Sequence, residues 1–465
     1  MDPELLRRTA EVAAEYLGSL PERPVRAGAS LDELRSALRV ALQDGSQPAL
    51  QVIEELVAAT EPGLVGTQSP RYFGFVIGGA LDAAIAADWL TSVWDQNGAG
   101  YPGGPSAAVV EEVACEWLLD ILGLPDDAGV GLTTGCQMAH FTCLAAARHR
   151  ALADAGWDVE ADGLFGAPPI RVLVGANAHT TLFAALRMLG LGSRRVELVA
   201  ADDQGRMRVS ELARLLGSGE GPAIVIGQVG EVNTGAIDAV PEIARLAHEH
   251  NAWCHVDGAF GLWAAASPTL RGLVEGVGEA DSWATDAHKW LNVPYDCGVA
   301  IVRDRAAHAA ATSSFVGAEY IPEPQHDERY GAEWVPELSR RARGFAVYAA
   351  LRELGRGGVA ALVERCCSCA RLMAEELACD PRATVLNDVV LNQVLVRFAC
   401  DGENVTDEVI DAVQREGTCW MGGTKWDGEP AMRISVCNWR TTEYDIRRSA
   451  SAILTQVGLA ARASA

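Results

Sequence analysis

Short apolar runs rich in β-branched residues alternate with longer amphipathic segments through the middle of the chain. Runs of this kind, bounded by turn residues, predict buried strands. They lie at 170–176, 194–201, 223–230, 252–260 and 298–304. The intervening segment 240–251 has the periodicity of a helix, with Pro241 near its first turn and Asn251 where a left-handed stop would fall. Continuous apolar strands separated by helices predict a mostly parallel sheet covered on both faces.

A different pattern begins after the helix predicted at 337–358. Strands predicted at 390–398 and 431–437, followed by a final helix, indicate a smaller α+β domain. The amino-terminal region is helical and apolar on one face, but it precedes the main domain. We therefore predict an α/β protein in three parts: a helical segment at 1–75, a large domain at 76–345 and a small carboxy-terminal domain at 346–465.

Charge and composition exclude several classes of protein. The formal net charge of -24 leaves no basic stripe for a phosphate backbone, so no nucleic-acid partner is expected. No stretch approaches the uncharged apolar length of a membrane span, and the amino terminus lacks the features of a signal peptide. The twelve cysteines are scattered and fit neither a zinc site nor a disulfide framework. We expect a cytoplasmic protein with reduced thiols, no membrane partner and no metal site.

Three polar residues stand at the carboxyl ends of predicted strands, where an open parallel sheet holds its active crevice. They are His179, Asp257 and Lys289, and the lysine follows a short strand-like run. In addition, a Gly-containing turn opens a helix within 131–148. Backbone N–H groups at such a helix start form a natural seat for a phosphate.

Pyridoxal phosphate needs this set of groups: an amine for a Schiff base, a carboxylate that keeps the pyridine nitrogen protonated, a flat side chain over the ring and a helix start for the phosphate. Each signal alone also has a structural explanation. Asp257 and His179 could be turn or cap residues, the turn could be simple strand-to-helix geometry, and Lys289 could lie in solvent or in a salt bridge. The combination is more specific, because Lys289 of "HK" follows Asp257 of "HVDGA" by 32 residues at the end of another strand.

On these residues the chain resembles the group II pyridoxal-phosphate-dependent amino-acid decarboxylases, which include aromatic amino-acid, glutamate and histidine decarboxylases. The resemblance runs from 70–79 to 432–442, and "DAHKWLNVPYDCG" and "HVDGAFGLWA" are its most specific parts. It implies an aspartate-aminotransferase-like fold, which is pyridoxal-phosphate fold type I. It also implies a homodimer with the active site at the interface and the amino-terminal segment across the partner subunit.

The resemblance assigns roles to residues as well. It makes Lys289 the Schiff-base lysine, with a pKa lowered by its neighbours, while Asp257 pairs with the pyridinium nitrogen and His179 stacks on the ring. The other cofactor contacts that it implies are His288, Gly135, Cys136, Gln137 and Ala259. Relatives often have Ser or Thr in place of Cys136, and Asn or Ser in place of Asp286. A carboxylate beside a phosphate would need protonation or an outward turn.

The reaction that the resemblance implies is α-decarboxylation of an L-amino acid to an amine and CO2. In the family a tyrosine on a mobile loop is implicated in returning a proton to the α-carbon. The loop at 316–334 offers Tyr330, which lies nearest the family register, and Tyr320. The alternative for Tyr330 is a solvent-exposed tyrosine without a catalytic role. The rival functions are a decarboxylating aldehyde synthase or an aminotransferase on the same fold, and, from another class, a cofactor-free binding protein.

The substrate side chain is the least determined part of this prediction. Aromatic residues cluster upstream in a chain otherwise poor in them, namely Tyr72, Phe73, Phe75, Trp94 and Tyr101. They are either core residues or the wall of a substrate pocket, with Tyr72, Phe73, Trp94 and Tyr101 as the pocket candidates. The pocket reading favours an aromatic or large apolar substrate. Glu231 and Asn233, which also follow a strand, are weaker candidates for contact with cofactor or substrate.

Overall fold

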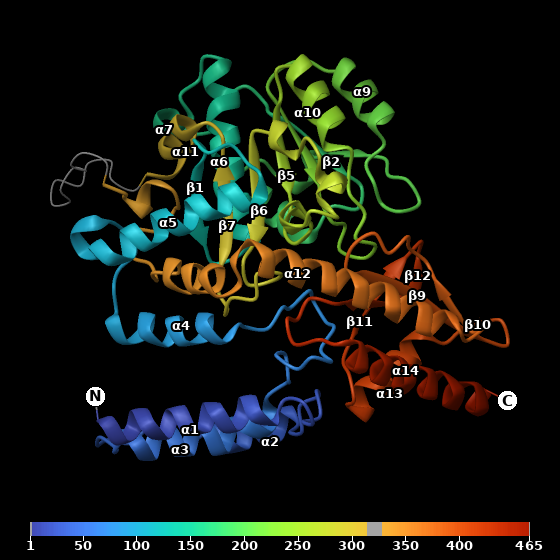
Figure 1. The fold of residues 1–465 in the computed structure, drawn as a ribbon. Coiled ribbons are helices and arrows are strands. Elements are labelled where there is room, and N and C mark those ends of the chain that lie inside the picture. Colours follow the sequence, from blue (N-terminus) through green and yellow to red (C-terminus); the bar gives the residue numbers. More distant parts are fainter. Residues whose placement is uncertain (1, 314–327, 465) are drawn as a thin grey trace. The chain divides into compact units, whose positions relative to one another are not determined.

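The computed structural model describes residues 2–313 and 328–464 and divides into two compact units (Figure 1). The larger unit comprises Gly78–Arg371 and Leu386–Val394. The smaller unit combines Met1–Ile77 with Leu372–Val385 and Leu395–Ala465, so it is built from both ends of the chain.

A seven-stranded sheet forms the centre of the larger unit. In spatial order its strands are β1 (Gly129–Thr133), β7 (Gly298–Val302), β6 (Ser282–Asp286), β5 (Trp253–Asp257), β4 (Ala223–Gln228), β2 (Arg171–Gly175) and β3 (Glu197–Val199). The strands from β3 to β6 pair in parallel, and β7 runs antiparallel to both β6 and β1. The predicted mostly parallel sheet is confirmed, and all five predicted strands are present. The sequence reasoning missed β1, whose five residues are all buried.

The antiparallel direction of β7 has a simple cause. Only residues 287–297 join β6 to β7, and a parallel return needs a crossover of a dozen or more residues, usually with a helix. The chain therefore turns back directly and carries Lys289 in the connection. As a result the carboxyl ends of β1 and β6 flank the start of β7, where Gly298 pairs with both Thr133 and Asp286.

Helices cover both faces of this sheet, as predicted. The helices of the larger unit are α4 (Asp82–Trp94), α5 (Pro105–Leu122), α6 (Cys136–Asp154), α7 (Val159–Asp162), α8 (Thr180–Met188), α9 (Val209–Gly217), α10 (Val240–Glu249), α11 (Arg305–Thr312) and the first part of α12 (Gly344–Ala378). On one face Val172 and Ile224 of the sheet pack in a core with α6 and α8. On the other, Gly227 lies against Ile243 of α10. The predicted left-handed stop after α10 is confirmed, because Asn251 has a φ of 54°.

The smaller unit contains helices α1 (Pro3–Ser19), α2 (Leu31–Leu38) and α3 (Ala49–Thr60) from the amino-terminal region. Its five-stranded sheet has the order β10 (Glu403–Asn404), β9 (Gln393–Cys400), β12 (Glu429–Ser435) and β11 (Gly422–Trp426), with β8 (Ala383–Val385) paired to β9. Helices α13 (Thr406–Glu416) and α14 (Glu443–Ser464) complete it. The predicted α+β character of this part of the chain is confirmed. In the described residues, no helix has the length and apolar content to cross a bilayer.

Candidate active site

The three residues singled out at strand ends do lie at one edge of the large sheet. Asp257 is the last residue of β5, and Lys289 follows the neighbouring strand β6 by three residues. His179 is the N-cap of α8, after β2. The start of α6 belongs to the same edge, because a Cβ at Gly298 would collide with the backbone of Gly135. Glycine at position 298 thus allows the start of α6 to approach β7.

Lys289 is largely buried, with 19% of its side chain exposed, and its Nζ lies 2.9 Å from Oδ2 of Asp286. Burial alone would lower the pKa of Lys289, but the carboxylates of Asp286 and Asp257 outweigh it and raise that pKa. The predicted lowering is therefore wrong for this arrangement, and the salt-bridge reading of Lys289 is realised. The amine must give up a proton before it can act as a nucleophile.

Asp286 also differs from expectation, because its carboxylate points inward. Its Oδ1 accepts a hydrogen bond of 2.6 Å from the backbone N–H of Cys136, at the start of α6, and lies 3.5 Å from Nε2 of His288. The carboxylate therefore engages a donor that the resemblance assigns to the cofactor phosphate. An anionic ligand at this helix start would share or displace the Asp286 contact.

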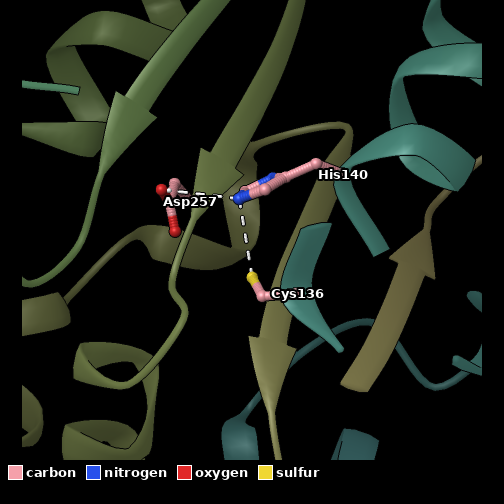
Figure 2. A group of neighbouring side chains, drawn as sticks. All are labelled: Cys136, His140 and Asp257. Carbon is pink, nitrogen blue, oxygen red and sulfur yellow. Dashed lines mark hydrogen bonds and ion pairs between the residues drawn. The ribbon is translucent and has the colours of Figure 1, made fainter. Parts of the chain in front are cut away.

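Asp257 is buried and held from two sides. Its Oδ1 accepts a hydrogen bond of 3.1 Å from the backbone N–H of Ala259, and its Oδ2 lies 3.5 Å from Nε2 of His140 (Figure 2). Burial would raise the pKa of Asp257, but His140, His179 and Lys289 outweigh it and hold that pKa well below its usual value. The carboxylate is therefore ionised, as a partner for a protonated ring nitrogen must be.

The two histidines assigned to the cofactor are both oriented by hydrogen bonds. Nδ1 of His179 lies 2.7 Å from Oγ1 of Thr181 and accepts from its backbone N–H, so the helix-cap reading of His179 is realised. Nδ1 of His288 accepts from the backbone N–H of Cys297 at 3.2 Å, and its ring centroid lies 4.3 Å from that of Tyr295. Burial lowers the pKa of His288. Stacking of His179 on a cofactor ring stays a prediction.

The predicted phosphate seat is formed by the first turn of α6. Gly135 is the N-cap residue of this helix and is half-buried, and Gln137 is exposed. The thiol of Cys136 is buried and lies 3.5 Å from Nε2 of His140 (Figure 2). Burial raises the pKa of this thiol well above its usual value, and the charges of Asp286 and Asp257 raise it further. Cys136 can therefore offer its backbone N–H to an anion, while its side chain faces the interior.

The loop tyrosines have different outcomes. Tyr330 is buried, with 2% of its surface exposed, and its ring packs against Gly100, where a side chain would meet the ring at 2.8 Å. The reading of Tyr330 as solvent-exposed is therefore wrong. Burial raises the pKa of its hydroxyl, and Glu328 and Glu333 add to this effect. Tyr320 lies outside the described residues, so the choice between the two tyrosines stays open.

The proposed pocket aromatics divide between the two units. In the smaller unit Tyr72 stacks on Trp420 with ring centroids 5.1 Å apart, and Phe73 is buried, which fits the core reading of both. In the larger unit Trp94 packs edge-on against Phe345 and remains 48% exposed, and Tyr101 is 36% exposed. Their role as substrate wall stays a prediction.

Glu231 forms a closed turn. It is buried, and its carboxylate accepts hydrogen bonds from the backbone N–H groups of Asn233 and Thr234 at 2.7 Å each. These hydrogen bonds give Glu231 a structural role in stabilising the turn.

Sequence reasoning missed His140 and His255, which lie behind Asp257. Two signals were present. His140 follows Cys136 by one helical turn, and His255 precedes Asp257 by two residues, so it points to the same face of its strand. Cys136, His140 and Asp257 are by residue type capable of binding a metal ion, and all three are buried. In the structure Sγ of Cys136 and Oδ2 of Asp257 each lie 3.5 Å from Nε2 of His140 (Figure 2).

A third signal concerns Lys289 itself. The chain has only two lysines, Lys289 and Lys425, although it is rich in arginine. Lys425 is exposed on β11 of the smaller unit. A lysine kept at a buried position in such a chain indicates a need for an amine that arginine cannot meet.

Pyridoxal phosphate fits the residues that the structure brings together. An amine (Lys289), an ionised buried carboxylate (Asp257) and a helix start with backbone N–H groups (Gly135–Gln137) match the aldehyde, the ring nitrogen and the phosphate of that molecule. All three come from the larger unit.

Comparisons with known proteins point to the same cofactor. Residues 32–399 match the model of the pyridoxal-dependent decarboxylase conserved domain. The chain is 31% identical over 391 residues to L-2,4-diaminobutyrate decarboxylase of Rhizobium meliloti, covering 82% of this chain and 75% of that protein. It is 24% identical to aromatic-L-amino-acid decarboxylase of Bacillus atrophaeus over 94% of this chain and 92% of that protein. The crystal structure of Oryza sativa TDC with PLP and tryptamine superposes with a TM-score of 0.91 at 22% identity, covering 99% of both chains.

The chain therefore belongs to the pyridoxal-dependent decarboxylase family, and its fold is that of pyridoxal-phosphate fold type I. It is an enzyme that uses pyridoxal phosphate to decarboxylate an amino acid.

Proposed function

We propose that this chain converts an L-amino acid with an aromatic or large apolar side chain to the amine and CO2, at a site formed by Lys289, Asp257 and His179. The observation that carries the proposal is the convergence of a buried amine and an ionised buried carboxylate at the ends of two neighbouring strands, β6 and β5. His288, Gly135, Cys136, Gln137 and Ala259 complete the cofactor contacts in this proposal.

When bound, pyridoxal phosphate supplies an electron sink for the bonding pair that remains when CO2 leaves. The chain supplies charge and proton control. Asp257 presents an ionised carboxylate that holds a proton on the ring nitrogen. The carboxylate of Asp286 forms an ion pair with the protonated Nζ of Lys289 until that amine reacts. Backbone N–H groups at the start of α6 bind the phosphate, and the half-buried ring of His179 covers the ring face.

The substrate class is supported by relatives that act on aromatic amino acids and by Trp94 and Tyr101, which stay partly exposed in the larger unit. A second candidate is a diaminobutyrate-like substrate, because that is what the relative with 31% identity decarboxylates. An amino group on the side chain would need a carboxylate partner in the pocket, which an aromatic side chain would not.

A screen of the common L-amino acids together with L-2,4-diaminobutyrate separates these candidates. We expect the highest kcat/KM for an aromatic substrate, with amine and CO2 formed in equal amounts. The measurement is the amine by chromatography and CO2 by a coupled assay in the same reaction. Turnover confined to diaminobutyrate would contradict the substrate proposal and keep the reaction, and keto-acid formation without CO2 would indicate an aminotransferase.

The proton for the α-carbon is assigned in this proposal to the hydroxyl of Tyr330. Replacement of Tyr330 by phenylalanine is expected to leave CO2 release measurable but to lower the ratio of amine to CO2 below one, because no acid remains at that position. Consumption of O2 and water would convert the shortfall to aldehyde, ammonia and hydrogen peroxide. The measurement is all of these products in one assay.

Two further variants make this test specific. Tyr348→Phe is the control, since Tyr348 stacks on Trp117 in the same unit, and its ratio should stay near one. A changed ratio for Tyr320→Phe but not for Tyr330→Phe would move the role to Tyr320. A wild-type enzyme that itself produces mainly aldehyde would identify an aldehyde synthase.

We also propose that the enzyme is a cytoplasmic homodimer with the active site at its interface. Within α1, α2 and α3 no residue is buried, and large apolar side chains such as Leu31, Val52 and Leu56 are exposed. An apolar helical surface of this kind needs a partner, and a second copy of the chain meets that need. All twelve cysteines lie in the described residues as free thiols, which supports a reducing compartment. The sedimentation of the loaded enzyme measures its oligomeric state directly.

A further inference from the structure

A continuous line of hydrogen bonds runs behind Asp257, away from the cofactor side. Nδ1 of His140 lies 3.0 Å from Nε2 of His255, and Nδ1 of His255 lies 2.8 Å from Oγ of Ser282. Ser282 in turn accepts a hydrogen bond of 2.9 Å from Nε1 of Trp253. These residues come from α6, β5 and β6, and every one of them is buried.

The positions of the protons in this line follow from the groups themselves. An ionised carboxylate only accepts hydrogen bonds, so Nε2 of His140 must carry a proton toward Asp257. In a neutral His140, Nδ1 then accepts, which makes Nε2 of His255 the donor and its Nδ1 an acceptor of the Ser282 hydroxyl. Burial lowers the pKa of His255 to about 3, so His255 is neutral and fits this arrangement. Each hydrogen bond then contains one proton.

The indole of Trp253 fixes the direction of the line. Its N–H can only donate, so it occupies an acceptor site on Ser282 and leaves the hydroxyl proton for His255. The thiol of Cys136 does not compete for the proton on His140, because a neutral thiol is a weak acceptor beside a carboxylate. A zinc ion would need the lone pair of Nε2 that this arrangement gives to the proton.

We propose that His140 is a positioning residue for the cofactor, which acts through Asp257. His255 and Ser282 hold His140 so that its Nε2–H points to Oδ2 of Asp257. This contact keeps the buried carboxylate charged and fixed in position. The inference rests on the proposed role of Asp257 toward the ring nitrogen of pyridoxal phosphate.

His140 is the neighbour best placed for this task. The titratable groups that interact with Asp257 are His140 and Cys136 from α6, His255 from β5, His179 from the start of α8 and Lys289 after β6. Lys289 is already paired with Asp286 at 2.9 Å, and His179 uses its Nδ1 at Thr181. Without His140, Asp257 would keep its burial, which raises its pKa, and would lose the hydrogen bond that opposes this effect, so its pKa should rise relative to the wild type. The carboxylate would then begin to take up protons as the pH falls.

The affinity of the apoprotein for pyridoxal phosphate, measured at several pH values, tests this inference. Quenching of tryptophan fluorescence reports the binding. In His140→Leu we expect weaker binding than in wild type, with an additional loss of about tenfold for each pH unit below the raised pKa of Asp257. In His140→Gln we expect most of this loss to be reversed, because the amide N–H reaches about as far as Nε2 and does not titrate. Comparison with wild type at each pH removes the titration of the cofactor itself.

Thr142→Val is the matched control. Thr142 is buried on the same helix and its hydroxyl bonds only the backbone carbonyl of Met138 in the contacts described, so its loss should leave the pH profile parallel to wild type. An unchanged profile in His140→Leu would overturn the proposal. A loss independent of pH and equal in His140→Leu and His140→Gln would show a packing role instead and would also overturn it.

A second measurement needs neither substrate nor cofactor. Nitrogen-15 NMR of the apoprotein should show both His140 and His255 as neutral Nε2–H tautomers, and Ser282→Ala should perturb both. Nδ1–H tautomers for these two residues would contradict the proposal. The first experiment measures cofactor binding and the second measures proton positions, and neither depends on turnover. If the proposed substrate or reaction is wrong, the enzyme will show no turnover but will still bind pyridoxal phosphate with the expected pH profile.

Discussion

Replacement of Lys289 by alanine is expected to abolish the covalent attachment of pyridoxal phosphate and essentially all turnover. No other described residue offers an amine at this edge of the sheet, and the only other lysine, Lys425, lies in the smaller unit. A covalent step has no substitute, so the loss should exceed the roughly 10²–10⁴-fold that removal of a general acid or base causes. The measurements are the visible absorbance of the loaded protein and product formation under single-turnover conditions.

Two variants separate the amine from its charge. Lys289→Arg keeps a cation beside Asp286 and should retain the thermal stability of the wild type but remain inactive. Lys425→Arg should behave as wild type, because that side chain is exposed on β11. Borohydride reduction of the wild type followed by peptide mass spectrometry should place the cofactor on Lys289. Full turnover by Lys289→Arg, or cofactor found on Lys425, would refute the assignment.

Replacement of Asp257 by asparagine is expected to lower kcat/KM by about 10²–10³-fold, the scale for losing one preorganised electrostatic group in a dry site. Asparagine nearly preserves the shape and still accepts a hydrogen bond from Ala259, so the protein should fold and retain some cofactor. It carries no negative charge to hold a proton on the ring nitrogen. The measurement is steady-state kinetics with the best substrate at saturating pyridoxal phosphate.

Asp238→Asn is the matched control for this variant. Asp238 is also a buried carboxylate of the larger unit that accepts two backbone hydrogen bonds, from Met207 and Gln228, and burial raises its pKa to about 6. Its replacement should leave turnover within a few-fold of wild type, since it contacts none of the proposed site residues. A comparable loss in both variants would show that any buried carboxylate matters for stability and would remove the special role of Asp257.

The strand ends that form the site could be predicted from the sequence because the apolar runs are continuous and the sheet is mostly parallel. In such a sheet the residue after each strand falls at one edge, which was enough to bring Asp257, Lys289 and His179 together. The first strand, β1, escaped prediction because glycines interrupt its short apolar run "GVGLT".

The electrostatics of the site could not be predicted in the same way. Asp286 meets the backbone of Cys136 across 150 residues of sequence, and His140 meets His255 across 115. No local pattern reports such a contact, so the inward turn of Asp286 and the raised pKa of Lys289 appear only in the folded chain. The burial of Tyr330 has the same origin, since its ring lies against the distant Gly100.

The pairing of β7 with β1 has a consequence for how the enzyme assembles. Asp257 and Lys289 are brought together by neighbouring strands close in sequence, whereas Gly298 must find Thr133 across a long loop of chain. Contacts between distant segments cost more loop-closure entropy and tend to form late in folding. We therefore expect the start of α6, which packs directly on Gly298, to join the amine and the carboxylate late in folding. Binding of the cofactor would then indicate that the larger unit has completed its folding. A chain arrested before this step would have the reactive lysine but not the helix start that binds the phosphate.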